Sequence, residues 1–364
     1  MIKVRQRPWW LIVDWPLLFF AFIIAVIGLI FIYSTTHTVA YPYSLFFKKQ
    51  LFGTVTGIMI FFLFAHIDYR MLINAGRIGY FLVLFLLIIT LIKGNAVMGG
   101  RRWLSGFFFK IQPSELTKLL FPAYFSHYMM SFDETADFYF FIPVITVLAI
   151  SFFLIAAQPD LGTALILGFS GFLLLWFAYV PRIFFITLFV CIMISSPIAW
   201  YLLKPYQKKR VAVFFGTQES EKDRYQLEQS IIAIGSGGMS GKGLFAGTQN
   251  RFHFLPESRT DFIFAVLCEE TGFVGALCLL LLYLLLLMRA WYLLFLVPRF
   301  YAQLCALGLL LPIMFSMVVN IGMVMGMLPI VGIPLPFMSY GIANLWVSWA
   351  SLGWFQSIIR SCKE

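Results

Sequence analysis

Ten apolar segments follow one another along the chain, and each is long enough to cross a bilayer. A helix rises about 1.5 Å per residue, so about 20 apolar residues cross the hydrocarbon core. The segments span roughly 16–34, 50–67, 77–93, 114–130, 138–156, 160–179, 183–203, 261–288, 300–325 and 341–359. They are apolar on all sides, whereas barrel strands alternate. The pattern predicts an all-α polytopic membrane protein, a bundle of about ten transmembrane helices forming one domain over residues 1–364.

Composition supports this interpretation. The chain is 61% hydrophobic and 12% charged, whereas a soluble domain is about a quarter charged. A single water-soluble core cannot hide so much apolar surface, so much of it must face lipid. Lys3, Arg5 and Arg7 precede the first apolar segment as in a signal peptide. That segment is too long and lacks a small-residue cleavage site, so we interpret it as the first span.

Charge predicts the orientation of the chain in the membrane. An even number of spans places both termini on one side, and short cytoplasmic loops carry an excess of Lys and Arg. With the termini inside, the ten inner cations are Lys3, Arg5, Arg7, Arg70, Arg77, Arg182, Arg289, Arg299, Arg360 and Lys363. The six in short outer loops are Lys48, Lys49, Lys93, Arg101, Arg102 and Lys110. We therefore predict a multi-pass protein with both termini cytoplasmic.

The long loop at 204–260 is then extracytoplasmic, and it is basic. A basic outer face suits an anionic ligand such as a lipid-linked pyrophosphate; the alternative is that its lysines only solvate the loop. Leu227, Ile231 and Ile234 recur at helical spacing, which predicts a short interfacial helix. The glycines at 235–247 fit no complete phosphate-binding motif, because the Walker residues and the βαβ unit are missing. We interpret them as tight turns.

Charged side chains inside apolar spans are costly and usually face a cavity or a partner. Glu115 and Lys118 lie three residues apart on one helix face, and Asp160 follows Pro159 at the start of the sixth span. Each has a structural alternative: an ion pair without chemistry for the first two, and an acidic helix N-terminus for Asp160.

Acidic residues are densest between the long loop and the eighth span. They comprise Glu257, Asp261, Glu269 and Glu270. Asp261 starts an apolar segment, so its carboxylate should lie near the outer interface, within reach of lipid-anchored headgroups. It is a candidate general base, or else a structural helix-start residue. Gly272 is expected to divide the eighth span into an interfacial piece and a true span.

Several short segments together resemble the SEDS family (shape, elongation, division and sporulation) of bacterial peptidoglycan glycosyltransferases. In chain order they are Gly99-Gly100-Arg101-Arg102-Trp103, Gln112-Pro113-Ser114-Glu115, Gln158-Pro159-Asp160-Leu161-Gly162-Thr163, Gly235-Ser236-Gly237-Gly238, Gly247-Thr248-Gln249, Leu255-Pro256-Glu257, Thr260-Asp261-Phe262-Ile263-Phe264-Ala265, Glu269-Glu270, Gly332-Ile333-Pro334-Leu335-Pro336 and Ser339-Tyr340-Gly341. Their order and spacing cover nearly the whole chain. Gly243 and the Phe254-Leu255-Pro256-Glu257 run favour the elongation members over the division members. Ile342 and Ala343 depart from the family's usual Gly-Ser.

The resemblance implies polymerisation of lipid II into β-1,4-linked glycan on the outer face, with release of undecaprenyl pyrophosphate. It implies that the catalytic aspartate is Asp261. The other expected substrate-binding residues are Arg101, Arg102, Glu115, Lys118, Asp160, Arg210, Glu257 and Arg259. Arg and Lys suit a pyrophosphate, and a divalent cation, Mg or Mn, can share that role. No histidine or cysteine cluster indicates where a metal would bind.

The expected partners are lipid II, nascent glycan, membrane lipids and a class B penicillin-binding protein, which is a transpeptidase; nucleic acid is not expected. Two other functions fit a ten-helix bundle, namely a lipid II flippase and a scaffold of the cell-wall synthesis complex. An acid at the outer surface favours the enzyme, because a transporter needs its ionisable groups near the midplane.

Overall fold

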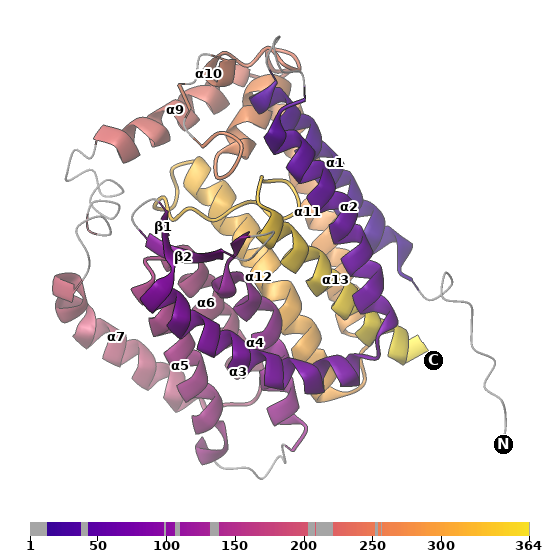
Figure 1. The fold of residues 1–364 in the computed structure, drawn as a ribbon, viewed down its shortest axis with the longest axis vertical. Helices are drawn as coiled ribbons and strands as arrows, with labels where there is room; N and C mark the ends of the chain where they lie inside the picture. The colour runs from indigo at the N-terminus through magenta and orange to yellow at the C-terminus, as the bar shows by residue number, and fades with distance from the viewer. Residues whose placement is uncertain are drawn as a thin grey trace.

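The computed structural model describes residues 13–37, 43–97, 100–105, 110–131, 138–202, 208, 221–251, 254–255 and 257–363. Each of the ten expected spans coincides with a helix (Figure 1). These are α1 (Trp15–Thr36), α2 (Leu45–His66), α3 (Tyr69–Lys93), α4 (Pro113–Met129), α5 (Ile142–Ala157), α6 (Leu161–Phe177), α7 (Arg182–Leu202), α11 (Ile263–Leu294), α12 (Phe300–Val324) and α13 (Ile342–Lys363). The shorter helices are η2 (Phe138–Phe141), α9 (Glu221–Gly237) and α10 (Thr248–Arg251).

Six helical stretches in the described chain are long and apolar enough to cross a membrane, by length and composition: α1, α2, α3, η2 with α5, α11 and α12. Two begin earlier than the sequence indicated, because polar side chains cap them. The Ser44 hydroxyl accepts from the Phe47 N–H at 3.1 Å, and Asp68 Oδ1 accepts from the Arg70 N–H at 2.7 Å. Such caps satisfy the first N–H groups of a helix, so α2 and α3 extend beyond their apolar runs.

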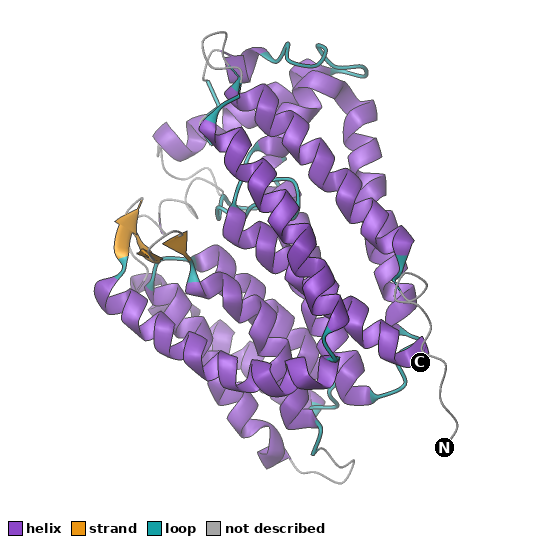
Figure 2. Ribbon diagram, turned by 45° about the vertical axis from the view of Figure 1, so that its right-hand side comes forward, coloured by secondary structure: helices purple, strands orange, loops and turns teal. Residues whose placement is uncertain are grey.

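A small antiparallel sheet between α3 and α4 was not predicted. It consists of β1 (Asn95–Val97), β2 (Gly100–Ser105) and β3 (Lys110–Ile111), with β2 in the middle (Figure 2). The strands are too short for an alternating pattern to be visible in the sequence. The sheet holds Arg102 beside the starts of α4 and α6.

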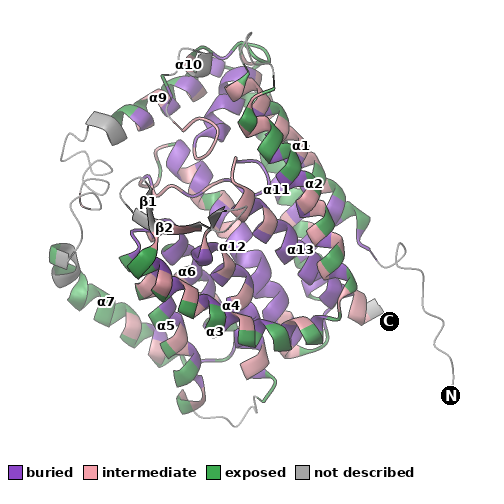
Figure 3. Cartoon of the chain, viewed as in Figure 1, coloured by how far each residue is buried: buried purple, intermediate pink, exposed green. Residues whose placement is uncertain are grey.

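The core lies around α4, α12 and α13, while the peripheral helices turn large apolar side chains outward (Figure 3). In α12, 67% of the most apolar window is buried, against 28% in α2 and α3. Since no water-soluble protein exposes such continuous apolar surface, the outward faces are the lipid-facing ones.

Helix α11 is broken at Gly272, as the sequence predicted. Gly272 has φ 68° and ψ −163°, a conformation essentially restricted to glycine. The N–H groups after the break are satisfied from the glycine-rich loop: Phe273 N donates to Gly238 O at 2.9 Å and Val274 N to Met239 O at 3.2 Å. A Cβ on Gly272 would lie 2.3 Å from Gly241 N. The break thus places the loop directly against the helix.

The two ends of the described chain meet at one end of the bundle. Asp14 N donates to Gln356 Oε1 at 3.2 Å, and Arg289 Nη2 pairs with Asp14 Oδ2 at 2.7 Å. Helices α9 and α10 cover the opposite end (Figure 1). Helix α9 forms where the sequence predicted a helix. Its buried residues include Gln226, Ser230 and Ala233, whereas Ile231 is exposed.

This arrangement makes the predicted orientation testable. Met239 and Tyr139 are both exposed, but they lie at opposite ends of the bundle. The background is a variant whose five native cysteines are replaced by alanine. In it we expect Met239→Cys to react with a membrane-impermeant maleimide in cells whose outer envelope is permeable but whose inner membrane is intact. Tyr139→Cys should react only after lysis. The reverse pattern would invert the topology.

Candidate active site

Four helices begin around one small region: α4 at Pro113, α6 at Leu161, α11 at Ile263 and α13 at Ile342. The first N–H groups of a helix have no partner within the helix, and the helix dipole is positive at this end. Helix starts that are connected to one another in this way favour an anion nearby. The polar side chains described next connect them.

Asp160 links the start of α6 to the start of α4. Its Oδ2 accepts from Gln112 Nε2 at 2.9 Å and from Ser114 Oγ at 3.0 Å, while its Oδ1 caps α6. Arg102 donates to the Pro159 carbonyl, and its Nη1 lies 3.9 Å from Asp160 Oδ1. The carboxylate is 5% exposed but the guanidinium 26%. Asp160 therefore orients Arg102, whose guanidinium is the more accessible group. The expected acidic helix N-terminus is confirmed.

Glu115 and Lys118 form a buried pair that reaches α13. Glu115 Oε2 lies 2.7 Å from Lys118 Nζ and accepts from Asn344 Nδ2 at 3.1 Å. Both charged side chains are at most 5% exposed. Breaking such a pair leaves an unpaired buried charge and costs about 3–5 kcal/mol. The predicted ion pair is confirmed, and it also fixes α4 against α13.

Asp261 lies just before α11, but Phe262 occupies the N-cap position. The Asp261 carbonyl accepts from Asn320 Nδ2 at 2.9 Å, and the same amide donates to Ile333 O at 2.7 Å. A Cβ added to Gly332, which has φ 72°, would lie 3.4 Å from Asp261 Oδ2. The carboxylate therefore sits beside a glycine and is partly exposed.

Arg259 and Glu257 shape the turn that carries Asp261. The Arg259 guanidinium lies 3.8 Å from the centroid of the Phe46 ring, and its carbonyl accepts from Tyr340 N at 2.9 Å. Burial raises the pKa of the Tyr340 phenol, which Arg259 opposes. Glu257 has φ 54°, and its Oε2 accepts from Thr260 Oγ1 at 3.0 Å. In this structure Glu257 acts within the turn.

The segment 331–341 connects the start of α6 to Asp261. A Cβ on Gly162 would lie 2.7 Å from Ile333 Cγ1 and 3.1 Å from Val331 O, so the start of α6 packs on this segment. Asp261 lies against Gly332, the residue between these two. Asp160 and Asp261 thus flank one short piece of chain, although they are about 100 residues apart in sequence.

Not every predicted site residue can be placed. Arg210 and the side chain of Arg101 lie outside the described residues. Conversely, Asn320 and Asn344 were not predicted, although an asparagine within an apolar span is an expensive residue and signals a partner. Gln112 and Ser114 were recognised only as parts of a motif.

The described residues do not fit a dedicated metal centre, because no three of their His, Cys, Asp or Glu side chains are grouped to hold an ion. The carboxylates of Asp160 and Glu115 are taken up by the partners named above.

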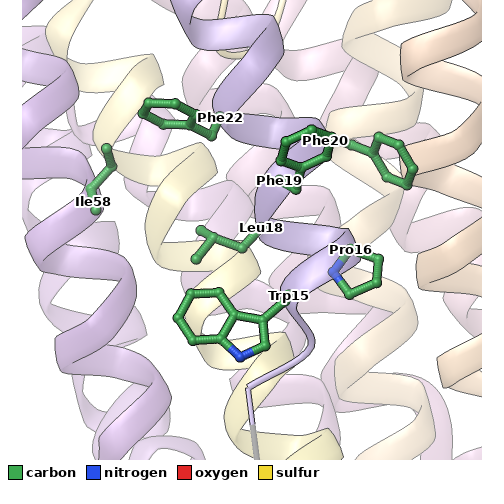
Figure 4. Close-up of a pocket in the computed structure, with 7 residues that line it drawn as sticks. All are labelled: Trp15, Pro16, Leu18, Phe19, Phe20, Phe22 and Ile58. Atoms are coloured by element: carbon green, nitrogen blue, oxygen red, sulfur yellow. The ribbon is translucent and has the colours of Figure 1, made fainter. Parts of the chain in front are cut away.

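One cavity lies away from these residues. It measures ≈ 610 Å³ and contains no charged group (Figure 4). It is lined by Trp15, Pro16, Leu18, Phe19, Phe20, Phe22 and Ile58. Without a titratable side chain it offers no chemistry.

Known proteins are similar to this chain in sequence and in fold. The FtsW/RodA/SpoVE family model, described as cell cycle protein, matches residues 14–364. Peptidoglycan glycosyltransferase MrdB of Escherichia coli K12 is 36% identical over 321 residues, which is 85% of each chain. Stage V sporulation protein E of Bacillus subtilis is 32% identical over 356 residues, 95% of this chain and 97% of that protein.

Two solved structures share the fold. The rod shape determining protein RodA of Thermus thermophilus matches with a TM-score of 0.72 at 27% identity, over 98% of this chain and 100% of that one. A chain from a structure titled structural coordination of polymerization and crosslinking by a peptidoglycan synthase complex matches with a TM-score of 0.81 at 27% identity, covering 97% and 99%.

The chain therefore belongs to the FtsW/RodA/SpoVE family, the SEDS proteins, and has their ten-span membrane fold. It is a membrane-embedded peptidoglycan glycosyltransferase that polymerises glycan strands.

The Asn320 amide gives a prediction for this site. Asn320→Leu keeps the size of the side chain but removes the donor to Asp261 O and Ile333 O. An unsatisfied buried carbonyl costs about 1–3 kcal/mol, so we expect a clear loss of thermal stability in detergent and lower polymerase activity. Gln303→Leu is the control on the same helix, since the Gln303 side chain makes no hydrogen bond within the described chain. Equal melting temperatures for the two variants would contradict this role.

Proposed function

We propose that the protein polymerises lipid II on the outer face of the inner membrane during cell elongation, as RodA-type members do, and that Asp261 is its general base. The observation that carries the proposal is the position of Asp261 among four helix starts, close to Arg259 in sequence and joined through the 331–341 segment to Asp160 and Arg102. An acid that accepts a proton and a positive environment that receives a pyrophosphate are the two requirements of the reaction.

The mechanism is a single displacement. Asp261 takes the proton of the 4-hydroxyl of the acceptor N-acetylglucosamine as its oxygen attacks C1 of the donor N-acetylmuramic acid. The bond from C1 to the pyrophosphate oxygen breaks on the opposite face, so the configuration inverts to β-1,4. Negative charge develops on the leaving undecaprenyl pyrophosphate, and Arg102 and Arg259, both partly exposed, are the cations that stabilise it. Lys118 is buried in its pair with Glu115 and contributes only through that pair. Arg101 and Arg210 remain candidates from the sequence.

The partner proposal rests on the synthase-complex relative. The fold of this chain matches one from a complex that couples polymerisation with crosslinking. We infer that this chain pairs with a class B penicillin-binding protein, which crosslinks the strands it makes. We also propose that both termini are cytoplasmic and that the 204–260 loop is outside, as the Lys and Arg distribution predicts. The motif around Gly243 supports the elongation role.

A lipid II flippase is the second candidate function, and the buried Glu115–Lys118 pair is the observation that favours it. A transporter moves its substrate past ionisable groups near the bilayer midplane. Here the pair lies in the first turns of α4, beside the helix starts, and is locked by Asn344. This position favours catalysis over transport.

Asp261→Asn tests the general base. The amide has the shape of the carboxylate but cannot take a proton, and losing a general base typically costs about 10²–10⁴-fold in rate. We expect purified Asp261→Asn, reconstituted with lipid II and the partner transpeptidase, to give no glycan polymer on a gel while inserting and binding its partner normally. Wild-type polymer levels would remove Asp261 from the mechanism and favour the flippase.

Arg102→Gln tests the stabilisation of the leaving group. Arg224→Gln is the matched control, because Arg224 is exposed and paired with Glu228 at 2.7 Å on α9. A hydrogen bond to a charged group is worth about 1.5–3 kcal/mol, so we expect kcat/KM for lipid II to fall about 10–100-fold in Arg102→Gln and to stay near wild type in the control. Similar losses in both would mean that the positive charge acts only as a diffuse field.

A further inference from the structure

Two adjacent buried glutamates stand in α11 beneath the glycine-rich loop, and the proposed reaction does not use them. Glu269 is fully buried. Its Oε1 accepts from Lys242 Nζ at 2.7 Å, from the Thr248 N–H at 2.8 Å and hydroxyl at 2.9 Å, and from the Gln249 N–H at 3.1 Å. Four donors on one carboxylate oxygen are far more than a helix residue needs for its own stability.

Glu270 holds the other half of the loop. Its Oε2 accepts from the Phe245 N–H at 3.0 Å, and its Oε1 accepts from the hydroxyl of Ser34 in α1. A Cβ on Gly247 would lie 3.0 Å from Glu269 Oε2 and 3.2 Å from Glu270 Oε1. The two carboxylates therefore pack tightly around a glycine, and a larger residue there would have to displace them.

The backbone completes the attachment. Lys242 N donates to Glu269 O and Gly243 N to Glu270 O, both at 3.0 Å. These two carbonyls lack their usual helical donors because α11 breaks at Gly272, and the N–H groups of Phe273 and Val274 donate to the loop instead. The N–H groups of Lys242, Gly243, Phe245, Thr248 and Gln249 are thus all taken up by the two glutamates.

The glutamates belong to the same short piece of helix that follows Asp261. Residues 263–271 lie between Asp261 and the break at Gly272. The break at Gly272 interrupts the helix, so the direction of this buried piece is set by what packs on it rather than by the rest of α11. The loop, bound through Glu269 and Glu270 and tied to α1 through Ser34, supplies that constraint.

We propose that Glu269 is a positioning residue for glycan polymerisation, which clamps the 241–249 loop onto the segment before the kink and thereby holds Asp261 at the acceptor hydroxyl. This inference rests on the proposed role of Asp261. Glu269 acts through its negative charge, because Lys242 is its ion-pair partner and the Lys242 side chain is 28% exposed. An amide at this position would keep the size but lose the attraction to the ammonium group.

The experiment compares four full-length variants reconstituted with lipid II: Glu269→Gln, Lys242→Gln, the double variant, and Glu228→Gln as control. Glu228 is an exposed glutamate, also paired with a cation at 2.7 Å, but on α9 away from the loop. Two readouts are taken, namely kcat and KM for lipid II, and hydrogen–deuterium exchange of peptides within 238–251.

We expect Glu269→Gln to exchange faster across the loop and to lose about 10²-fold in kcat, since a displacement of about 1 Å at a reacting group costs that much. KM should change by no more than about threefold, because the residue does not bind substrate. Lys242→Gln should lose less kcat, because the other donors to Glu269 remain. The double variant should match Glu269→Gln, because both single changes remove the same ion pair. Glu228→Gln should behave as wild type in both readouts.

Unchanged loop exchange in Glu269→Gln would overturn the clamp, and faster exchange with normal kcat would overturn its link to catalysis. Multiplicative losses in the double variant would show that the two residues act separately. If Glu269→Gln does not insert, the exchange and kcat of Lys242→Gln decide. Asp261→Asn is run in parallel: normal polymer with that variant defeats the general-base proposal, whereas the exchange data still judge the clamp.

Discussion

The constraint on which the structure depends is that irregular backbone buried inside the protein, out of reach of water, must have its N–H and C=O groups satisfied by other protein groups. The 331–341 segment is such a piece of chain. Gln50 Nε2 donates to Ser339 O and its Oε1 accepts from Gly341 N, while the Tyr283 hydroxyl donates to Pro336 O. Asn320 serves Ile333 in the same way. Three helices, α2, α11 and α12, supply these groups, so the segment depends on all three being in place.

The same constraint explains why the site is rigid. Each buried charge near it already has a partner of its own: Asp160 binds amide and hydroxyl groups, and Glu115 binds Lys118 and Asn344. The helix starts then supply positive potential without any mobile side chain. A charge that develops during reaction meets dipoles that are already oriented, which is the physical content of preorganisation.

The sequence predicted what depends on composition and short spacing. Apolar runs predicted ten helices, the three-residue spacing predicted the Glu115–Lys118 pair, and Gly272 predicted the break in α11. It could not predict Asn320 and Asn344 as site residues, because their partners are carbonyl and carboxylate groups brought close only by folding. The strands of the small sheet are too short to show a period. Glu269 and Glu270 were noticed as an acidic pair, but their loop partners lie 20 to 27 residues upstream, and Ser34 lies in α1.

The break at Gly272 also bears on how the protein tolerates its solvent. Bilayers differ in thickness, and a spanning helix adjusts to them by tilting. In an unbroken α11 any tilt would be transmitted along the rod to its first turn. Here the lipid-exposed part after Gly272, which carries Phe273, Leu277 and Leu284 on its surface, meets the preceding part through a single glycine. The part after Gly272 can therefore tilt with the thickness of the bilayer, while the part before it keeps its position in the site.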